Sequence, residues 1–294
     1  METKQLAFFK RAAELEHFTK AANDLYVSQP FLSRTIANLE EELGVKLFDH
    51  VGRGVVLNPC GQAFYKWVVK FFNEAEEARR ELWAISKKLT AQLTLVTNVG
   101  LYLPGLFSIM SHREGGLNIT QYSARRSQII RMLLDGRVDF ALCCPLIDEE
   151  PEIQSVPLHR ERGVIIYPPG HWLSGRKRVS VAELRNEAFI SVTSGFGVRE
   201  VTDDFFRRAG MNPNIIIESA DTGSVLKFVK SGLGIAVAPY YLIRLDEDFK
   251  DSYVELEEHM EGAVGISWRR DHYLSEAGSE FIETTKNYFS AFGS

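Results

Sequence analysis

Residues 18–58 read FTKAANDLYVSQPFLSRTIANLEEELGVKLFDHVGRGVVLN, and this stretch decides the fold of the N-terminal part of the chain. It predicts two short helices joined by a tight turn and followed by two short strands. Thr19 is expected to cap the first helix and Ser28 the second, because each hydroxyl can accept a hydrogen bond from a free backbone N–H. Gly44 is a natural stop for the second helix, and Arg53 lies at the glycine-rich tip between the strands.

The second predicted helix has one apolar and one polar face. Its apolar residues recur at spacings of 4, 3 and 4, as expected of one buried stripe: Leu32, Ile36, Leu39 and Leu43. The other face carries side chains that can bind phosphates or read base edges: Gln29, Ser33, Arg34 and Asn38. These side chains cluster at the N-terminal half, which points into the major groove in helix-turn-helix proteins. The pattern fits DNA binding, but it fits a helix-turn-helix unit with a purely structural role equally well.

Net charge does not decide between these two interpretations. Residues 1–60 hold seven Lys and Arg against eight Asp and Glu, and the whole chain of 294 residues has a formal net charge of −5. DNA binding therefore requires the positive side chains to gather on one face of the folded domain.

The stretch resembles the N-terminal domain of LysR-type transcriptional regulators. That family's pattern runs approximately F-T-x-A-A-x-x-L-x-x-S-Q-P-x-x-S-x-x-I-x-x-L-E-x-x-L-G-x-x-L-F, and this chain keeps nearly every fixed position. It departs at His50, where the family usually has Arg, and at Asn58, where it usually has Thr. The resemblance implies a winged helix-turn-helix domain that binds operator DNA. The residues expected to contact DNA are Thr19, Lys20, Ser28, Gln29, Pro30, Ser33, Arg34 and Arg53.

A long helix is expected over residues 59–89. Asn58 and Pro59 suit its start, and a heptad-like series of apolar residues follows: Phe64, Val68, Phe71, Ala75, Ala78, Leu82 and Ile85. Such a stripe packs either on its own domain or on a partner helix, and the regular spacing favours the partner. The resemblance implies a linker helix that pairs two subunits, so we expect a homodimer through residues 59–89 that assembles further into a tetramer.

Length and cysteine content set further bounds. The chain is long enough for two or three domains, and no run of 18 apolar residues or signal peptide is visible, so we expect a cytoplasmic protein that does not contact membranes. Three cysteines fit a reducing compartment. Cys143 and Cys144 lie in an apolar run and are expected to be buried strand thiols, with a redox-sensing role as the alternative.

Strand and helix patterns alternate from about residue 91 to residue 289, which predicts parallel-rich α/β sheets. The segment 163–167 is expected to be a strand, and 263–269 another. The effector domains of LysR-type regulators look like this, with two Rossmann-like subdomains similar to periplasmic binding proteins, and KSGLGIAVAP at 230–239 resembles a late motif of that family. The predicted domains are 1–58 for DNA binding, 59–89 for the linker and 90–294 for the effector, with subdomain I at about 90–162 and 266–294 and subdomain II at about 163–265.

Ligands of doubly wound sheets gather at the carboxyl ends of strands, beside helix N-termini. Three such places follow predicted strands, and their hydroxyls, carboxamide and backbone N–H groups suit a small anionic organic effector. The residues expected to bind it are Asn98, Val99, Gly100, Leu101, Tyr102, Thr193, Ser194, Gly195, Phe196 and Thr222. Phe196 and Tyr102 are expected to cover an apolar part of the ligand, while Thr222 and Ser194 are equally compatible with simple helix caps.

One glycine-containing segment also fits a rival function. Gly195-Phe196-Gly197 follows a strand like part of a dinucleotide fingerprint, but Glu200 stands where the third glycine belongs and would repel a pyrophosphate. A nucleotide-dependent enzyme or a small-molecule-binding module without a DNA role therefore remains the alternative. The sequence predicts no catalytic residue, metal or cofactor. The expected partners are double-stranded operator DNA, the effector, other copies of the chain and RNA polymerase.

Overall fold

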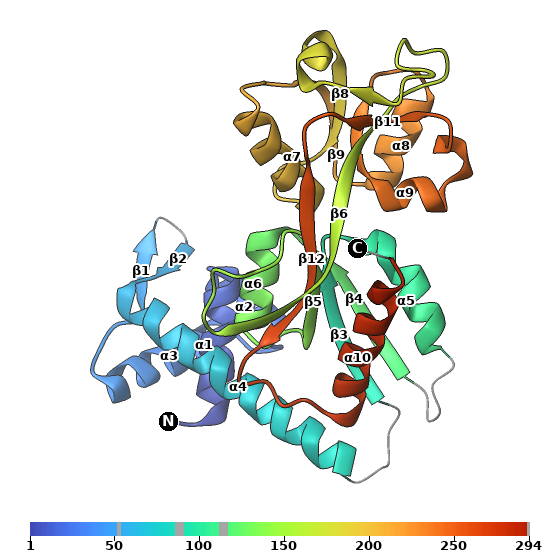
Figure 1. Ribbon diagram of the computed structural model, residues 1–294. Helices are drawn as coiled ribbons and strands as arrows, with labels where there is room; N and C mark the ends of the chain where they lie inside the picture. The colour runs from blue at the N-terminus through green and yellow to red at the C-terminus, as the bar shows by residue number, and fades with distance from the viewer. Residues whose placement is uncertain (52–53, 86–90, 112–116, 293–294) are drawn as a thin grey trace. The chain divides into compact units, whose positions relative to one another are not determined.

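The computed structural model describes residues 1–51, 54–85, 91–111 and 117–292, which belong to two compact units, Met1–Ser86 and Lys87–Ser294 (Figure 1). The first unit contains α1 Thr3–Leu15, α2 Phe18–Asp24, α3 Gln29–Leu43, β1 Phe48–Val51, β2 Gly54–Leu57 and α4 Pro59–Ile85. Side chains of α1, α2, α3 and the first turns of α4 enclose one core, in which Phe9, Leu32 and Leu39 have no exposed surface. Strands β1 and β2 pair antiparallel, as predicted for a wing.

Most of the predicted helix ends in this unit are confirmed. Ser28 precedes α3, and its Oγ accepts a hydrogen bond from the Phe31 N–H at 3.4 Å. Gly44 ends α3 in the left-handed conformation, with φ 70°. The prediction that Thr19 caps α2 is wrong. The helix already begins at Phe18, whose ring packs edge-on against Phe48, so Thr19 lies inside the first turn.

Asn58 joins the wing to α4. Its Oδ1 accepts a hydrogen bond from the Gly61 N–H at 2.9 Å, which caps the helix, and its Nδ2 donates to the Lys46 carbonyl at 2.9 Å. A threonine at this position would offer the cap but not the second amide bond. The departure from the family pattern at Asn58 is therefore accommodated by an additional contact.

The second unit is an α/β structure of two lobes. Its elements are β3 Ala91–Thr97, η1 Gly100–Tyr102, α5 Leu103–Met110, β4 Leu117–Ser123, α6 Arg126–Leu134, β5 Phe140–Cys143, β6 Ile153–Ile166, β7 Arg178–Val179, η2 Val181–Asn186, β8 Ala188–Val192, α7 Gly197–Arg208, β9 Asn214–Ser219, α8 Thr222–Lys230, β10 Ala236–Pro239, α9 Tyr240–Leu245, η3 Glu247–Phe249, β11 Tyr253–Leu256, β12 Glu261–Arg269 and α10 Glu276–Ser290. Figure 1 shows β6 and β12 running side by side between the lobes.

The sheet topology explains how the two lobes are connected. One sheet has the strand order β4-β3-β5-β12-β6-β11-β7, with β10 also paired to β6, and β8 and β9 form a separate parallel pair. Strand β3 is parallel to both β4 and β5, whereas β6 and β12 are antiparallel to each other. The predicted pair of α/β subdomains is thus confirmed, and the antiparallel strands β6 and β12 connect them.

The long crossing strand differs from its prediction. The sequence indicated a strand only at 163–167, but β6 begins at Ile153. Its middle carries Pro157 and the charged run at 159–162, which hide the usual period-2 signal. The reason is that this segment passes between two cores and is only partly buried on the way.

The two adjacent cysteines are buried, as predicted. Cys143 ends β5 with no exposed surface, and Cys144 follows it at 6% exposure. Burial raises the pKa of the Cys143 thiol to about 11 and that of Cys144 to about 12. Both side chains are therefore protonated and unreactive near neutral pH, whereas Cys60 on α4 is exposed.

Candidate functional site

The first candidate surface is the N-terminal half of α3 with the facing part of α2. Gln29, Pro30 and Arg34 are exposed and Ser33 is partly exposed, while Leu32 between them is fully buried. On α2, Thr19 and Lys20 are also exposed. Because Leu32 is buried in the core, the polar residues of the first turns of α3 face solvent. The Ser28 cap defines where this helix begins.

Ion pairs separate the cations of this unit into two groups. Glu14, Asp24 and Glu40 hold Lys10, Arg11 and Lys46 in ion pairs at N–O separations of 2.6–3.3 Å. Lys20 and Arg34 pair with no acidic residue in the described part of the chain. The nearly equal numbers of positive and negative residues at 1–60 therefore do not show that Lys20 on α2 and Arg34 on α3 carry positive charges that are unpaired within the described ranges.

Lys4 is a further cation that sequence reasoning missed. Its Nζ lies 5.6 Å from the ring centroids of Phe8 and Phe31, and Phe31 is in the first turn of α3. Nothing in the local sequence indicates this position, because it depends on how α1 packs against α3. The ammonium group of Lys4 therefore joins the exposed end of the helix.

A buried carboxylate fixes the wing to α3. Glu40 is 7% exposed, and its Oε1 accepts hydrogen bonds from the backbone N–H groups of Leu47 at 2.8 Å and Phe48 at 3.4 Å. Its Oε2 accepts from Lys46 at 2.7 Å. These bonds satisfy a buried charge and set where β1 leaves the helix. Arg53, predicted at the wing tip, lies outside the described residues.

The predicted stripe on α4 divides into two parts. Phe64 and Val68 pack on the core of their own unit, and Val68 is only 2% exposed. Further along the helix, Phe71 is 45% exposed and Leu82 is 66% exposed. Ala75 and Ala78 between them are exposed too. The interpretation that the stripe packs on its own domain is therefore right for its start. Its continuation is an exposed apolar strip, and the pairing of that strip with a partner helix stays a prediction.

In the second unit, Asn98 joins the ends of two parallel strands. Its Nδ2 donates to the Cys144 carbonyl at 3.0 Å, and its Oδ1 accepts from the Cys144 N–H at 3.1 Å. Thr97 supports the same turn, since its Oγ1 donates to the Leu142 carbonyl and accepts from the Val99 N–H. The loop that starts at Cys144 is thus brought beside the predicted site, and no local motif indicates this contact.

The loop of residues 193–196 reaches across to the other lobe. The Gly195 carbonyl accepts a hydrogen bond from the Arg126 N–H at the start of α6, at 3.1 Å. Gly195 has φ 90°, and a Cβ placed there would lie 3.0 Å from Cδ of Arg125, so both conformation and space favour glycine. The Oγ1 of Thr193 is buried and has no hydrogen-bond partner among the described residues. Ser194 is exposed and Phe196 partly exposed.

Arg126 organises the lobe interface and was missed by the sequence reasoning. Its guanidinium donates to the Leu146 carbonyl at 3.0 Å and to Glu149 at 2.7 Å. Glu200 on α7 lies 3.9 Å from its Nε, and burial raises the pKa of the Glu200 carboxyl. Arg126 therefore binds both lobes. Its backbone N–H bonds to Gly195 of one lobe, and its guanidinium bonds to the 146–149 loop of the other. No spacing in the sequence links residues 126, 149 and 200.

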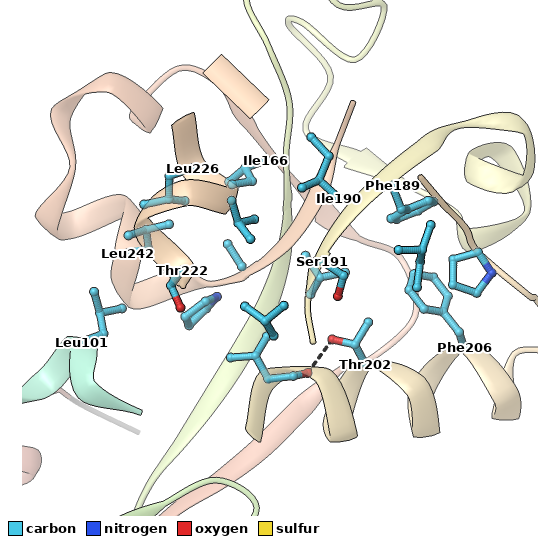
Figure 2. A pocket seen from close by; sticks show the side chains of 18 residues that line it. Leu101, Ile166, Phe189, Ile190, Ser191, Thr202, Phe206, Thr222, Leu226 and Leu242 are labelled. Carbon is cyan, nitrogen blue, oxygen red and sulfur yellow. Dashed lines mark hydrogen bonds between the residues drawn. The ribbon is translucent and has the colours of Figure 1, made fainter. Parts of the chain in front are cut away.

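An apolar pocket lies in the lobe that contains β8, β9, α7 and α8, beside the crossing strand β6, and Leu101 of the other lobe also lines it (Figure 2). Its walls come from β6, β8, β10, α7 and α8, and its few polar lining groups include Ser191, Thr202 and Thr222. The Thr202 hydroxyl donates to the Val198 carbonyl at 2.7 Å. Of the ten predicted effector residues, only Leu101 and Thr222 line this pocket.

Two groups that were expected to contact the effector have another role in the structure: the ring of Tyr102 and the backbone N–H groups at the start of α8. Tyr102 is 2% exposed, its ring stacks on Tyr241 at 4.8 Å, and its hydroxyl donates to Glu161. It therefore belongs to the core and does not cover a ligand in this arrangement. At α8 the cap is Asp221, whose carboxylate accepts from the N–H groups of Gly223 at 3.2 Å and Ser224 at 2.7 Å, so these donors are not free. The alternative that Thr222 and Ser194 are helix caps is therefore wrong, since Thr222 lies inside α8 and Phe196 directly precedes α7.

The described residues contain no group of three or more His, Cys, Asp or Glu side chains placed to hold a metal ion. None of the described helices is both long and apolar enough to cross a membrane.

Comparison with known proteins identifies the family. The model for the LysR substrate binding domain matches residues 89–290, and the model for the bacterial regulatory helix-turn-helix protein of the lysR family matches residues 3–62. The chain is a LysR-type transcriptional regulator. The resemblance seen in the sequence is therefore confirmed, and with it the function of a DNA-binding regulator that carries an effector-binding domain.

Similar proteins cover either nearly all of this LysR-type regulator or its effector-binding part. An HTH-type transcriptional regulator named YybE from Bacillus subtilis (strain 168) is 31% identical over 99% of this chain and 100% of its own. Full-length CbnR in complex with its target DNA is similar in structure, with a TM-score of 0.67 and 20% identity over 98% of this chain and 100% of the other. The effector binding domain of QuiR in complex with shikimate has a TM-score of 0.60 and 18% identity, over 69% of this chain and 99% of that domain.

Proposed function

We propose that this regulator binds operator DNA by placing the N-terminal end of α3 in the major groove. The observation that carries the proposal is the exposed end of α3 with Lys20 and Arg34, which have no acidic partner among the described residues. Helix N-termini with free cations beside them suit a polyanionic duplex. The structurally similar CbnR forms a complex with its target DNA, which supports the binding of DNA by this chain.

Each residue is assigned a role by its chemistry. Gln29 and Ser33 read base edges, because their side chains can donate and accept hydrogen bonds. Arg34, Lys20 and Lys4 bind phosphates. The remaining predicted contacts are assigned to positioning on the DNA backbone: Thr19, Ser28, Pro30 and Arg53.

We propose that two subunits pair through the exposed strip of α4. Phe71 and Leu82 are large apolar side chains at heptad spacing with small alanines between them, as at a helix–helix seam. Pairing also brings two recognition helices to two half-sites.

The proposed domain division is as follows: residues 1–58 bind DNA, 59–89 link and dimerise, and 90–294 bind the effector, with subdomains at about 90–162 plus 266–294 and at about 163–265. Further assembly into a tetramer and contact with RNA polymerase belong to the same proposal.

The proposed effector site lies between the two lobes of the second unit. The loop 193–196 and the start of α6 are joined by the Arg126–Gly195 hydrogen bond. The turn Asn98-Val99-Gly100-Leu101 follows Thr97, whose carbonyl accepts a hydrogen bond from the Ala124 N–H at 3.1 Å, two residues before α6. The unpartnered Thr193 hydroxyl can bind a ligand, and the side chain of Arg125 adds positive charge for an anion. Leu101 and Thr222 connect this region to the apolar pocket, so a small organic acid with an apolar body fits best. The effector binding domain of QuiR, which is similar in structure, forms a complex with shikimate, and this supports a small organic acid as the ligand.

Control by the effector follows from differential affinity for two lobe arrangements. A ligand bound between the lobes replaces or strengthens the contact between Arg126 and Gly195. It thereby changes the distance between the two lobes that is most stable. The relatives are named as transcriptional regulators, which supports a regulatory rather than an enzymatic role.

Two experiments test the proposal. Replacing Arg34 by Ala should weaken binding to all duplexes and reduce the salt dependence by about one unit of slope per lost phosphate contact. Replacing Gln29 by Ala should instead relax sequence preference by about 1–3 kcal/mol. An Arg34→Ala variant with unchanged affinity and salt slope would disprove this docking. For the effector, a thermal-shift screen of organic acids followed by calorimetry on Thr193→Val and Ser194→Ala tests the cleft, and wild-type affinity in both would place the ligand elsewhere.

A further inference from the structure

Tyr26, in the turn between α2 and α3, has an exposed side chain and an unusual backbone. It is 95% exposed, the highest value among the large hydrophobic side chains that the structure describes. Its φ is 55°, in the left-handed region that side chains rarely adopt. Glu16 is the only other non-glycine residue with positive φ in the described ranges.

The turn accounts for the backbone of Tyr26 but not for its side chain. The Tyr26 N–H donates to the Asn23 carbonyl at 3.2 Å, and the Val27 N–H donates to the Ala22 carbonyl at 2.9 Å. This pair of bonds is a Schellman motif, which ends a helix and requires a left-handed residue where glycine is most common and asparagine is tolerated. A tyrosine there strains the backbone and, because its ring stays in water, buries almost no apolar surface in return.

The location of Tyr26 suggests what the side chain is for. Ser28, two residues later, caps α3, and Gln29 follows as the first residue of the helix assigned to the major groove. In helix-turn-helix docking the recognition helix enters the groove by its N-terminal end, so the turn before it lies near the phosphates at the groove edge. A phenol is a neutral hydrogen-bond donor at physiological pH and is one of the side chains that bind phosphate oxygens.

We propose that the hydroxyl of Tyr26 donates a hydrogen bond to a backbone phosphate beside the groove that α3 enters. The proposal rests on the docking of α3 given above. Tyr26 is thus a positioning residue: it fixes the helix on the duplex without reading a base. Its backbone strain is retained because the tyrosine is needed on DNA and not for folding.

A neutral donor differs from a cation in a measurable way. Removing a Lys or Arg contact reduces the salt slope, because fewer counterions are released, whereas removing a phenol leaves the slope unchanged. With full-length protein and a random-sequence duplex, Tyr26→Phe should bind about tenfold more weakly at every salt concentration. Its preference among sequences should be unchanged. The control is Tyr273→Phe, at an exposed tyrosine of the second unit, which should bind like the wild type.

A second variant tests the strain. Tyr26→Asn relieves the left-handed backbone, so amides of α2 and α3 in the full chain should exchange hydrogen more slowly than in the wild type, while DNA binding weakens as in Tyr26→Phe. Wild-type affinity in Tyr26→Phe overturns the hydrogen bond to phosphate. If Arg34→Ala loses affinity and slope while Tyr26→Phe does not change, only this inference fails. If neither variant changes, the docking of α3 fails as well.

Discussion

The divided stripe on α4 allows association and folding to be perturbed separately. Leu82 is 66% exposed, so its side chain contributes little to the fold of its own unit. Val68 is 2% exposed and packs in the core of that unit. Leu82→Asp should therefore separate subunits without unfolding them, and Val68→Ala should destabilise the unit without acting on the seam.

The exposed fraction sets the expected magnitude. Covering most of a leucine side chain stabilises a contact by about 1–2 kcal/mol, and a two-fold symmetric dimer loses this twice, so dissociation constants should rise about 30- to 700-fold. Desolvation of the new carboxylates acts in the same direction. The stability of the separated chain should change by less than about 0.5 kcal/mol. Val68→Ala should lower the free energy of unfolding by about 1–3 kcal/mol.

Sedimentation velocity over a range of concentrations measures association, and urea unfolding followed by circular dichroism measures stability. The matched control is Lys70→Asp, which places the same carboxylate on α4 at an exposed position off the stripe and should leave the dimer intact. A Leu82→Asp chain that sediments as the wild type at all concentrations would refute the assignment of this strip to a partner helix.

Three further outcomes are expected. Gly61→Ala places a Cβ 2.0 Å from the Leu47 carbonyl oxygen, so the first unit should lose about 1–3 kcal/mol of stability. The control Gln62→Ala, at an exposed position, should not lose it. Equal urea midpoints for the two variants would contradict the close packing of Gly61 against Leu47. The pKa values of Cys143 and Cys144 are raised by burial from an ordinary value of 9.0 to about 11 and about 12, so their contribution to stability is complete below pH 9 and is lost as pH rises toward those values. A Cys144→Ala variant should show a flatter decline above pH 9 in urea titrations. In native protein a thiol reagent should modify Cys60 alone, and rapid labelling of Cys143 would contradict its burial.

Elements that depend on local sequence were largely predictable. The Ser28 cap, the Gly44 stop and the Asn58–Pro59 start of α4 use side chains within a few residues of the backbone that they bind, so their signals are readable in one stretch. Thr19 failed as a cap because packing of Phe18 on Phe48, 30 positions later, decided where α2 begins.

Long-range contacts decided what the sequence did not show. Arg126 bonds to the 146–149 loop and approaches Glu200, which are separated from it by loops and whole elements. The position of Tyr102 after a strand predicts a ligand contact, but its ring stacks on Tyr241 and its hydroxyl donates to Glu161 in the core. The split of the α4 stripe between core and surface likewise depends on where the first unit ends, which periodicity alone does not reveal.

Selection of binding sites from a pool of random duplexes, followed by footprinting, tests the central claim most directly. A dimer that places one α3 in each of two major grooves should enrich an inverted repeat whose half-sites are centred about 10 bp, or a multiple of this, apart. Gln29→Ala should relax the same base position in both half-sites. Recovery of no enriched sequence, or of a single half-site bound by one subunit, would contradict the account.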